Sequence, residues 1–257
     1  MKLAAQILLI ILLVPLLFLG VLAFTFKFQL LNSSFWINAL EKGGAYSRTS
    51  SALKTYFEQK IEKEGGRAGD ARVLTDLITP ENLKDITEKN ITNLLSFANA
   101  QNSEPIIYLP VKKIPRGLLP KEFATLPENI PLPTLLSKFN IAGVDAEQIR
   151  QFSSLGRAAG YFLVLDLVIA AIFLLLLILL TEKGKRLVAP AIALFLTSMP
   201  VFALTRGGAV SGTGGSSPAE VIALNLLPPV FGAIGIIWII IGFSLIGLGV
   251  VLLFLKK

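Results

Sequence analysis

One acidic residue, Asp166, interrupts the apolar segment 158–181. A carboxylate deep in a bilayer costs roughly 2.5–3.5 kcal/mol on insertion scales, so it should be paired, protonated or in contact with water. Asp166 is therefore the candidate intramembrane polar residue. Four roles are open to it: passage of an ion or proton, docking to a basic residue of a partner, a hydrogen bond within a helix bundle, and snorkelling toward the surface. The residues expected at a depth suitable for binding it are Ser198, Thr205, Arg206 and Asn225.

Three glycines, Gly235, Gly242 and Gly249, recur every seven residues in the last apolar segment. This spacing places them on one helical face, where a second helix can approach closely because no side chain intervenes. They are the candidate helix-packing residues, and the expected consequence is packing or oligomerisation. Glycine is frequent in membrane helices, so chance spacing is the alternative.

Histidine and cysteine are absent from the 257 residues. Their absence excludes Ser-His-Asp triads, histidine-ligated haem, ordinary zinc sites, disulfides, iron–sulfur clusters and thiol nucleophiles. We therefore predict a non-enzymatic protein with no catalytic residues, no metal site and no cofactor. A Ser–Lys hydrolase needs neither residue type, but no local pattern indicates one. An aspartyl intramembrane protease would need a second carboxylate beside Asp166.

Four apolar segments are candidates for crossing a bilayer, whose hydrocarbon core of about 30 Å takes about 20 helical residues. Only 16% of the chain is charged, against roughly 25% in soluble domains. The predicted fold is mainly α: a four-helix transmembrane bundle with a mostly helical extracytoplasmic domain inserted between helices 1 and 2. In order, we predict transmembrane helix 1 at 1–27, the extracytoplasmic domain at 28–157, helix 2 at 158–181, a cytoplasmic turn at 182–186, helix 3 at 187–205, an extracytoplasmic Gly/Ser-rich loop at 206–227, and helix 4 with a cytoplasmic end at 228–257.

The first segment begins with Lys2 and continues as an apolar core longer than the roughly 7–15 residues of a signal peptide. We therefore expect a retained signal anchor. Cleavage is the alternative, since residues 21–23 resemble the small-residue cleavage pattern.

Basic residues next to the apolar segments indicate the orientation. Lys2, the cluster at 183–186 and the terminal pair at 256–257 lie on one side if the chain crosses four times. By the positive-inside rule that side is the cytoplasm. We expect a multi-pass protein of the cell membrane with both termini cytoplasmic and residues 28–157 extracytoplasmic.

The domain at 28–157 is nearly neutral, with 16 basic and 14 acidic residues. No basic run in it is longer than Lys112-Lys113. The net charge of +7 on the chain therefore does not form the basic patch that nucleic acid needs. The predicted partners are the lipid bilayer and a protein partner or homo-oligomer, and no nucleic acid.

Helical periodicity dominates the first half of this domain. Thr79-Pro80-Glu81 predicts a helix start, because it combines a hydroxyl cap, a proline in the first turn and a carboxylate near the positive end of the helix dipole. Polar Asn90 interrupts the apolar stripe of that helix. The other expected boundaries are a cap at Ser33 or Ser34, an end at Gly43-Gly44 and a second helix at 45–64.

The second half is rich in proline and begins with an apolar stretch at 105–111 that we expect to be extended. An ordered coil across the helices is favoured over a peptide ligand, because no clean Pro-x-x-Pro repeat occurs. The Asp-Ala-Glu-Gln sequence at 145–148 predicts a capping box whose helix runs into the second membrane segment. Gly156 and Gly160 would instead allow a hinge there.

Prolines also occur in the third and fourth segments, at Pro190, Pro200 and Pro228-Pro229. They allow broken helices like those at transporter binding sites, although no internal repeat accompanies them.

The chain resembles a diffuse group of uncharacterised bacterial integral membrane proteins that have an ectodomain between the first and second transmembrane helices. The residues that suggest it are FWINALEKGGAY at 35–46 and LITPENLKDITEKNITNLLSF at 77–97. The resemblance implies architecture and a bacterial host, and no activity. Our hypothesis is an ectodomain that binds a partner for assembly, sensing or envelope organisation. The alternative is a small transporter or channel component that uses Asp166.

Overall fold

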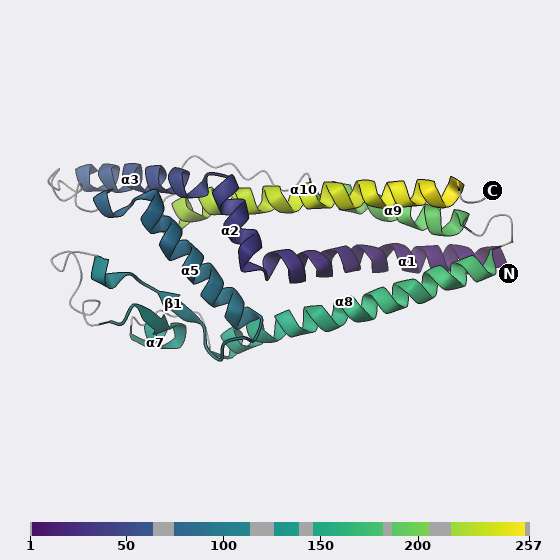
Figure 1. Ribbon diagram of the computed structural model, residues 1–257, viewed down its shortest axis with the longest axis horizontal. Helices are drawn as coiled ribbons and strands as arrows, with labels where there is room; N and C mark the ends of the chain where they lie inside the picture. Colours follow the sequence, from purple (N-terminus) through teal and green to yellow (C-terminus); the bar gives the residue numbers. More distant parts are fainter. Residues whose placement is uncertain are drawn as a thin grey trace. The chain divides into compact units, whose positions relative to one another are not determined.

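The computed structural model describes residues 2–63, 75–113, 126–138, 146–181, 187–205 and 217–254. Within them the chain is mainly helical, as predicted (Figure 1). The helices are α1 (Lys2–Thr25), α2 (Ser33–Lys42), α3 (Ala45–Lys63), α5 (Pro80–Ala98), α7 (Leu132–Lys138), α8 (Ala146–Leu180), α9 (Val188–Thr205) and α10 (Pro218–Phe254). A π-helical turn, Phe26–Leu30, follows α1, a 3-10 turn forms at Val111–Lys113, and the strands are β1 (Ile106–Tyr108) and β2 (Asn129–Pro131).

Contacts divide the chain into two compact units. The first, here called the apolar unit, comprises Met1–Gln29, Ala158–Ala209 and Phe231–Lys257. The second, here called the polar unit, comprises Leu30–Arg157 and Val210–Val230.

Three helices are long and apolar enough to cross a membrane. Their apolar stretches are Leu3–Leu30, Gly156–Leu180 and Pro218–Phe254. The apolar part of α9, Val188–Ala203, is shorter and measures about 24 Å at 1.5 Å per residue, against a hydrocarbon core of about 30 Å. The structure thus supports a membrane protein, and the fourth crossing through α9 stays a prediction.

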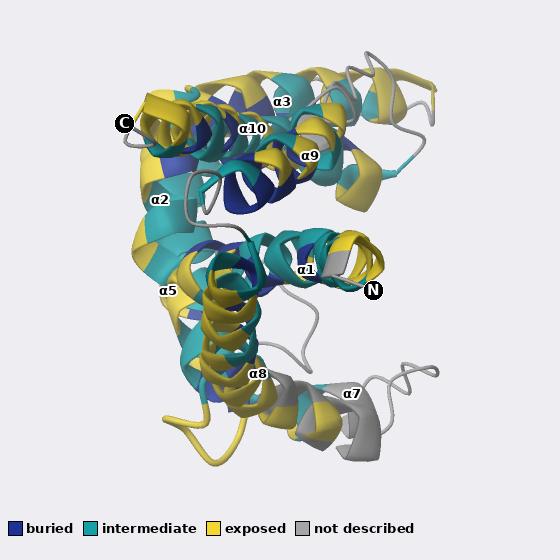
Figure 2. Ribbon diagram, turned by 90° about the vertical axis from the view of Figure 1, so that its right-hand side faces the viewer, coloured by how far each residue is buried: buried dark blue, intermediate teal, exposed yellow. Residues whose placement is uncertain are grey.

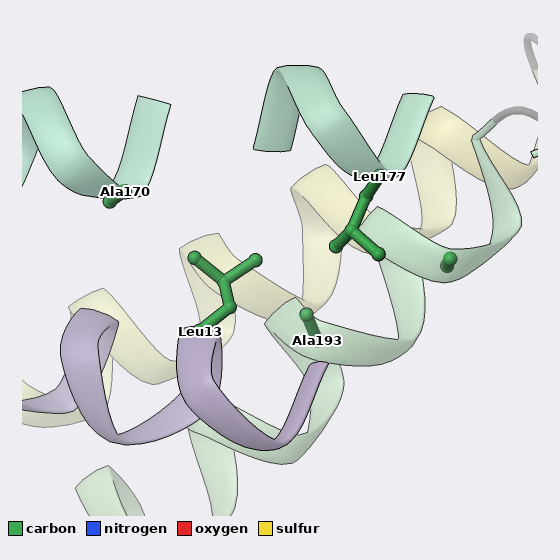
Figure 3. Packing of buried hydrophobic residues seen from close by; sticks show 5 residues of the cluster. Leu13, Ala170, Leu177 and Ala193 are labelled. Atoms are coloured by element: carbon green, nitrogen blue, oxygen red, sulfur yellow. The ribbon is translucent and has the colours of Figure 1, made fainter. Parts of the chain in front are cut away.

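Buried aliphatic side chains from three helices form the core of the apolar unit (Figure 3). Leu13 of α1, Leu177 of α8 and Ala193 of α9 are fully buried, and Ala170 and Ala189 join them. Small residues on α8 and α9 let the helix backbones approach closely, which favours dispersion contacts between helices in lipid.

The helix α10 differs from the expected fourth segment. It begins at Pro218, so the stretch expected to be a loop up to residue 227 is helical from there on. Ser217 caps this start, since its Oγ accepts a hydrogen bond from the Glu220 N–H at 3.2 Å. Proline in the first turn sacrifices no helical hydrogen bond. The Ser-Pro-Ala-Glu sequence is a capping-box pattern that the surrounding Gly/Ser-rich composition obscured.

The prolines expected to break helices lie within continuous ones. Pro200 is inside α9, and Pro228 and Pro229 are inside α10. Membrane-type helices tolerate proline where neighbouring groups satisfy the freed carbonyls. The described parts of both segments therefore do not show the broken helices of a transporter site.

In the polar unit, α2 is capped by Asn32 and not by Ser33 or Ser34. The Asn32 side-chain carbonyl accepts a hydrogen bond from the Ser34 N–H at 3.0 Å, a reach typical of asparagine before a helix. The end of α2 at Gly43-Gly44 is as predicted, and Gly44 has a φ of +61° that glycine adopts without strain. The next helix, α3, spans Ala45–Lys63.

The helix α5 contacts α2, α3 and β1 and is the centre of the polar unit. Its predicted start is confirmed: Thr79 Oγ1 accepts a hydrogen bond from the Asn82 N–H at 3.1 Å, and Pro80 is the first helical residue. The strand predicted within 105–111 is β1, which pairs antiparallel with β2 so that Ile107 lies opposite Ile130. The proline-rich stretch at 114–125 and the residues 64–74 that follow α3 lie outside the described residues.

The helix α8 begins at Ala146 and continues without a break past Gly156 and Gly160 to Leu180. A Cβ added at Gly156 would overlap with the main-chain carbonyl of Ala98 in α5. Gly156 therefore permits close packing instead of forming a hinge. Residue 145, the expected cap, lies outside the described residues.

Much of α8 and α10 is exposed (Figure 2), and the exposed side chains of the two units differ in kind. Exposed large hydrophobic side chains are frequent along α1, α8 and α10, with Leu3, Tyr161 and Phe254 among them. Within 30–157, the described residues include no such side chain. This contrast is expected of one surface that meets lipid and another that meets water. The basic residues at 183–186 and 256–257, which carry the orientation signal, lie outside the described part.

Candidate functional site

Asp166 is buried inside the apolar unit, with 3% of the residue exposed. It faces Gly20 of α1 so closely that a Cβ added at Gly20 would overlap with Asp166 Oδ2. Its neighbours Leu165 and Leu167 are exposed. The side chain missing at Gly20 therefore provides the space for the carboxyl group, while the adjacent positions on α8 face outward.

No described residue pairs with this carboxyl group. Asp166 Oδ1 has no hydrogen-bond partner. Ser198 and Asn225, two of the predicted partners, donate instead to carbonyls of their own helices at 2.7 and 2.8 Å. The side chains of Thr205 and Arg206 lie outside the described residues.

This burial bears on the four roles considered for Asp166. Docking to a basic residue of another membrane protein requires a carboxyl group that faces lipid, and snorkelling requires one that reaches the surface. A carboxyl group with 3% exposure is suited to neither. A hydrogen bond within the bundle has no donor among the described residues. Burial without a described partner is compatible with the remaining role, the binding of an ion or a proton.

Besides Asp166, Thr197 and Ser198, the apolar unit buries two polar residues that sequence reasoning missed, Thr25 and Gln29. Thr25 Oγ1 accepts a hydrogen bond from Trp238 Nε1 at 2.8 Å, which links α1 to α10. Gln29 lies in the π-helical turn, and neither polar atom of its amide has a partner in the described part of the chain. From the sequence we expected the membrane segment to end at residue 27, so that Gln29 would lie just beyond it. The structure continues the helical stretch to Leu30, which places Gln29 within it.

The glycine face of α10 contacts α9 at two of its three positions. A Cβ at Gly242 would lie 2.7 Å from the Phe202 ring, and one at Gly249 would lie 3.3 Å from the Ala191 carbonyl. Gly235 has no atom within 4 Å of its added Cβ. The two helices run antiparallel, because Gly249 faces Ala191 and Gly242 faces Phe202. Gly235, two turns before Gly242 on α10, therefore lies beyond the end of α9 at Thr205.

Lys84 and Lys89 of α5, in the polar unit, each form an ion pair. Lys84 Nζ lies 2.8 Å from Glu41 Oε1, and Lys89 Nζ lies 2.8 Å from Asp85 Oδ1 and 4.0 Å from the centre of the Tyr108 ring. The hydrogen bond from Lys84 lowers the pKa of Glu41, and the hydrogen bond to Asp85 raises the pKa of Lys89. Both shifts favour the charged forms, which are poorly suited to proton transfer near neutral pH.

The remaining polar contacts of α5 hold the polar unit together. The Tyr46 hydroxyl donates to Glu88 Oε1 at 3.3 Å. Burial, followed by the charge of Glu88, raises the pKa of Tyr46. Asn90 binds both main-chain groups of Tyr108: its Nδ2 donates to the carbonyl at 2.9 Å, and its Oδ1 accepts from the N–H at 2.7 Å. The residue that interrupts the apolar stripe thus fixes β1 to α5.

Within the described ranges, no group of three or more acidic side chains is arranged to hold a metal ion. Compared with protein-family models, curated proteins and solved structures, the chain matches none of them.

Proposed function

We propose that the chain is a non-enzymatic, multi-pass membrane protein whose extracytoplasmic domain, residues 28–157, binds a partner for assembly, sensing or envelope organisation. The contrast between the surfaces of the two units supports this proposal. Membrane-type helices expose large hydrophobic side chains, whereas the described residues of 30–157 do not. A water-compatible unit attached to membrane helices is suited to recognition outside the bilayer. The partner is a second protein or a second copy of the chain.

The exposed side of α3 is the surface we assign to this contact. One side of α3 holds Tyr46 and Leu53, which are buried. The other side displays only polar residues, so its contacts would be hydrogen bonds and ion pairs, as at the polar rim of many interfaces. Its exposed members are Ser47, Arg48, Ser51, Thr55, Glu58, Gln59 and Glu62.

Photo-crosslinking in native membranes tests this assignment. A photoreactive amino acid at Thr55, Glu58 or Glu62 is expected to capture one product of defined mass. The same group at Val168, which is exposed on α8, is expected to give no such product. If no position on α3, α5 or α2 gives a product that Val168 lacks, the domain does not bind a protein partner.

The topology belongs to the same proposal: four crossings, α1 as a signal anchor, both termini cytoplasmic and a bacterial host. The absence of cysteine makes the test simple, since single-cysteine variants need no altered background. In intact cells, Ser34→Cys is expected to react with an impermeant maleimide, and Lys257→Cys only after permeabilisation. Reaction of Lys257→Cys from outside would show that α9 does not cross.

A second function, as a small transporter or channel component, is supported by Asp166. Its Oδ1 has no partner in the described structure, and Gly20 leaves room for its carboxyl group. Purified protein in liposomes is expected to conduct an ion or proton, and Asp166→Asn is expected to abolish the flux without loss of insertion. An unchanged flux in Asp166→Asn would contradict this function.

A further inference from the structure

The carboxyl group of Asp166 has no cationic residue at its own level on the helix that faces it. In α1, no ionisable residue occurs between Lys2 and Lys27. The Cε atom of Lys27 lies 3.9 Å from a Cβ added at Gly160. Gly160 precedes Asp166 by six residues on α8, which is about 9 Å along the helix. Lys27 is therefore placed more than a turn away from the carboxyl group.

In the part of the chain that the structure describes, the other helices place no cation beside Asp166 either. The sequence of α9 contains no ionisable residue, and neither does α10 from Phe231 to Phe254. On the apolar stretch of α8, the remaining titratable residues are Arg157 and Tyr161, and both are exposed. Asp166 thus carries the only acidic side chain in the described residues of the apolar unit and has no basic partner there.

A proton fits this site better than a metal cation. Metal ions such as Ca²⁺ and Mg²⁺ bind through about six or more oxygen atoms. The surface opposite Asp166 is Gly20, which has no side chain to supply an oxygen ligand. A proton needs one oxygen atom. It also removes the charge whose burial is unfavourable.

We propose that Asp166 is a proton-binding site whose carboxyl group is neutral beside Gly20 and exchanges its proton. The biological role of this site rests on the transport function proposed above, but proton binding is measurable by itself. Gly20 acts as a positioning residue, because any side chain there would displace the carboxyl group.

The test uses the full chain in lipid vesicles and the apolar reagent N,N′-dicyclohexylcarbodiimide. A protonated carboxyl group adds to this reagent: its proton goes to a carbodiimide nitrogen and its oxygen bonds to the central carbon, and the adduct rearranges to a stable N-acylurea. Mass spectrometry of the peptide that contains Asp166 is expected to show one adduct. The labelling is expected to fall about tenfold per pH unit above the carboxyl midpoint. Sodium or potassium ions at constant pH are expected to have no effect.

Matched variants identify the site. Asp166→Asn is expected to lose the adduct entirely, and Gly20→Ala to lose labelling several-fold because its Cβ would take the place of Oδ2. Gly160→Ala is the control, since its Cβ would meet only Lys27 Cε, at 3.9 Å. Infrared spectra supply a second measurement: the carbonyl band of a protonated acid is expected in the wild type and not in Asp166→Asn.

Each outcome decides the proposal. Labelling, or the acid band without labelling, supports a protonated Asp166. Protection by sodium or potassium ions overturns the proposal in favour of a metal cation. Absence of both adduct and acid band at every pH also overturns it, because the carboxyl group is then ionised. If labelling occurs while Asp166→Asn leaves the ion flux unchanged, the proton site stands and the transport function fails.

Discussion

Asn90 in the polar unit and Asp166 in the apolar unit each place a polar side chain where the surrounding pattern is apolar. Asn90 makes three hydrogen bonds, two to the main chain of Tyr108 and one to the Ile86 carbonyl. Asp166 makes none to the described residues, and its Oδ1 is buried without a partner. A polar residue in an apolar stripe can therefore have two different roles. Asn90 stabilises the fold through its hydrogen bonds, whereas the carboxyl group of Asp166 is available to bind a ligand.

Asn90 and Asp166 differ in whether the buried polar side chain has hydrogen-bond partners, and this difference distinguishes a structural residue from a candidate functional one. A buried group that is hydrogen-bonded returns much of the free energy lost on leaving water, whereas an unpaired group does not. The unpaired Asp166 thus destabilises the fold, and protonation of its carboxyl group reduces this cost. Substitution at the two positions should accordingly have effects of opposite sign.

The largest effect is expected for Asn90→Ala. Loss of its side chain leaves the N–H and carbonyl of Tyr108 without their partners, and the polar unit should lose about 3 kcal/mol of stability. Hydrogen exchange of the Tyr108 amide should accelerate about 100-fold. Asn93→Ala, one turn further along α5, is the control and should leave this exchange unchanged. Equal exchange rates of the Tyr108 amide in both variants would contradict the structural role of Asn90.

Asp166→Leu is expected to have the opposite sign. Leucine also branches at Cγ, so the change removes the two polar oxygen atoms while largely keeping the shape of the side chain. Insertion of α8 should become more favourable by about 2 kcal/mol, because Asp166 lies near the middle of the span Gly156–Leu180. A membrane-insertion assay of the α8 segment measures this term, and thermal unfolding of the full chain in detergent should shift upward. A downward shift would mean that the carboxyl group has a stabilising partner.

Close packing in the apolar unit gives a smaller, position-specific effect. Gly242→Ala should destabilise the contact of α10 with α9 by about 1.5 kcal/mol, because its Cβ would overlap with the Phe202 ring. Gly235→Ala should be neutral, since nothing lies within 4 Å of its added Cβ. Thermal unfolding in detergent compares the two. Destabilisation by Gly235→Ala would indicate a contact with another copy or another protein.

The smallest effect is expected for Tyr46→Phe, which removes one hydrogen bond worth about 1 kcal/mol at neutral pH. The raised pKa of Tyr46 adds a pH dependence. A raised folded-state pKa stabilises the protein below the unfolded-state value of about 10, and this contribution is lost as the pH rises further. Thermal unfolding between pH 9 and about 11 should therefore show a steeper decline in wild type than in Tyr46→Phe. Tyr56→Phe, the control, should decline like wild type.

Local sequence patterns predicted what depends on near neighbours in the chain. The Thr79-Pro80-Glu81 start, the glycine end of α2 and the apolar helices follow from capping, backbone freedom and hydropathy, all of which act over a few residues. The start of α10 was missed, although the Ser217-Pro-Ala-Glu220 pattern marks it. Asn32 was missed as a cap because hydroxyl residues directly follow it.

By itself, the sequence determined that apolar helices flank a nearly neutral, mostly helical region and that one acidic residue lies within the apolar stretches. Only the tertiary structure decided what that residue faces. Residues 20 and 166, like residues 90 and 108, are brought together by packing between separate elements. Neither pairing leaves a periodicity or spacing that a single sequence reveals. Whether a polar side chain in an apolar stripe finds a hydrogen-bond partner therefore depends on contacts between separate helices and strands. These contacts distinguish Asn90 from Asp166.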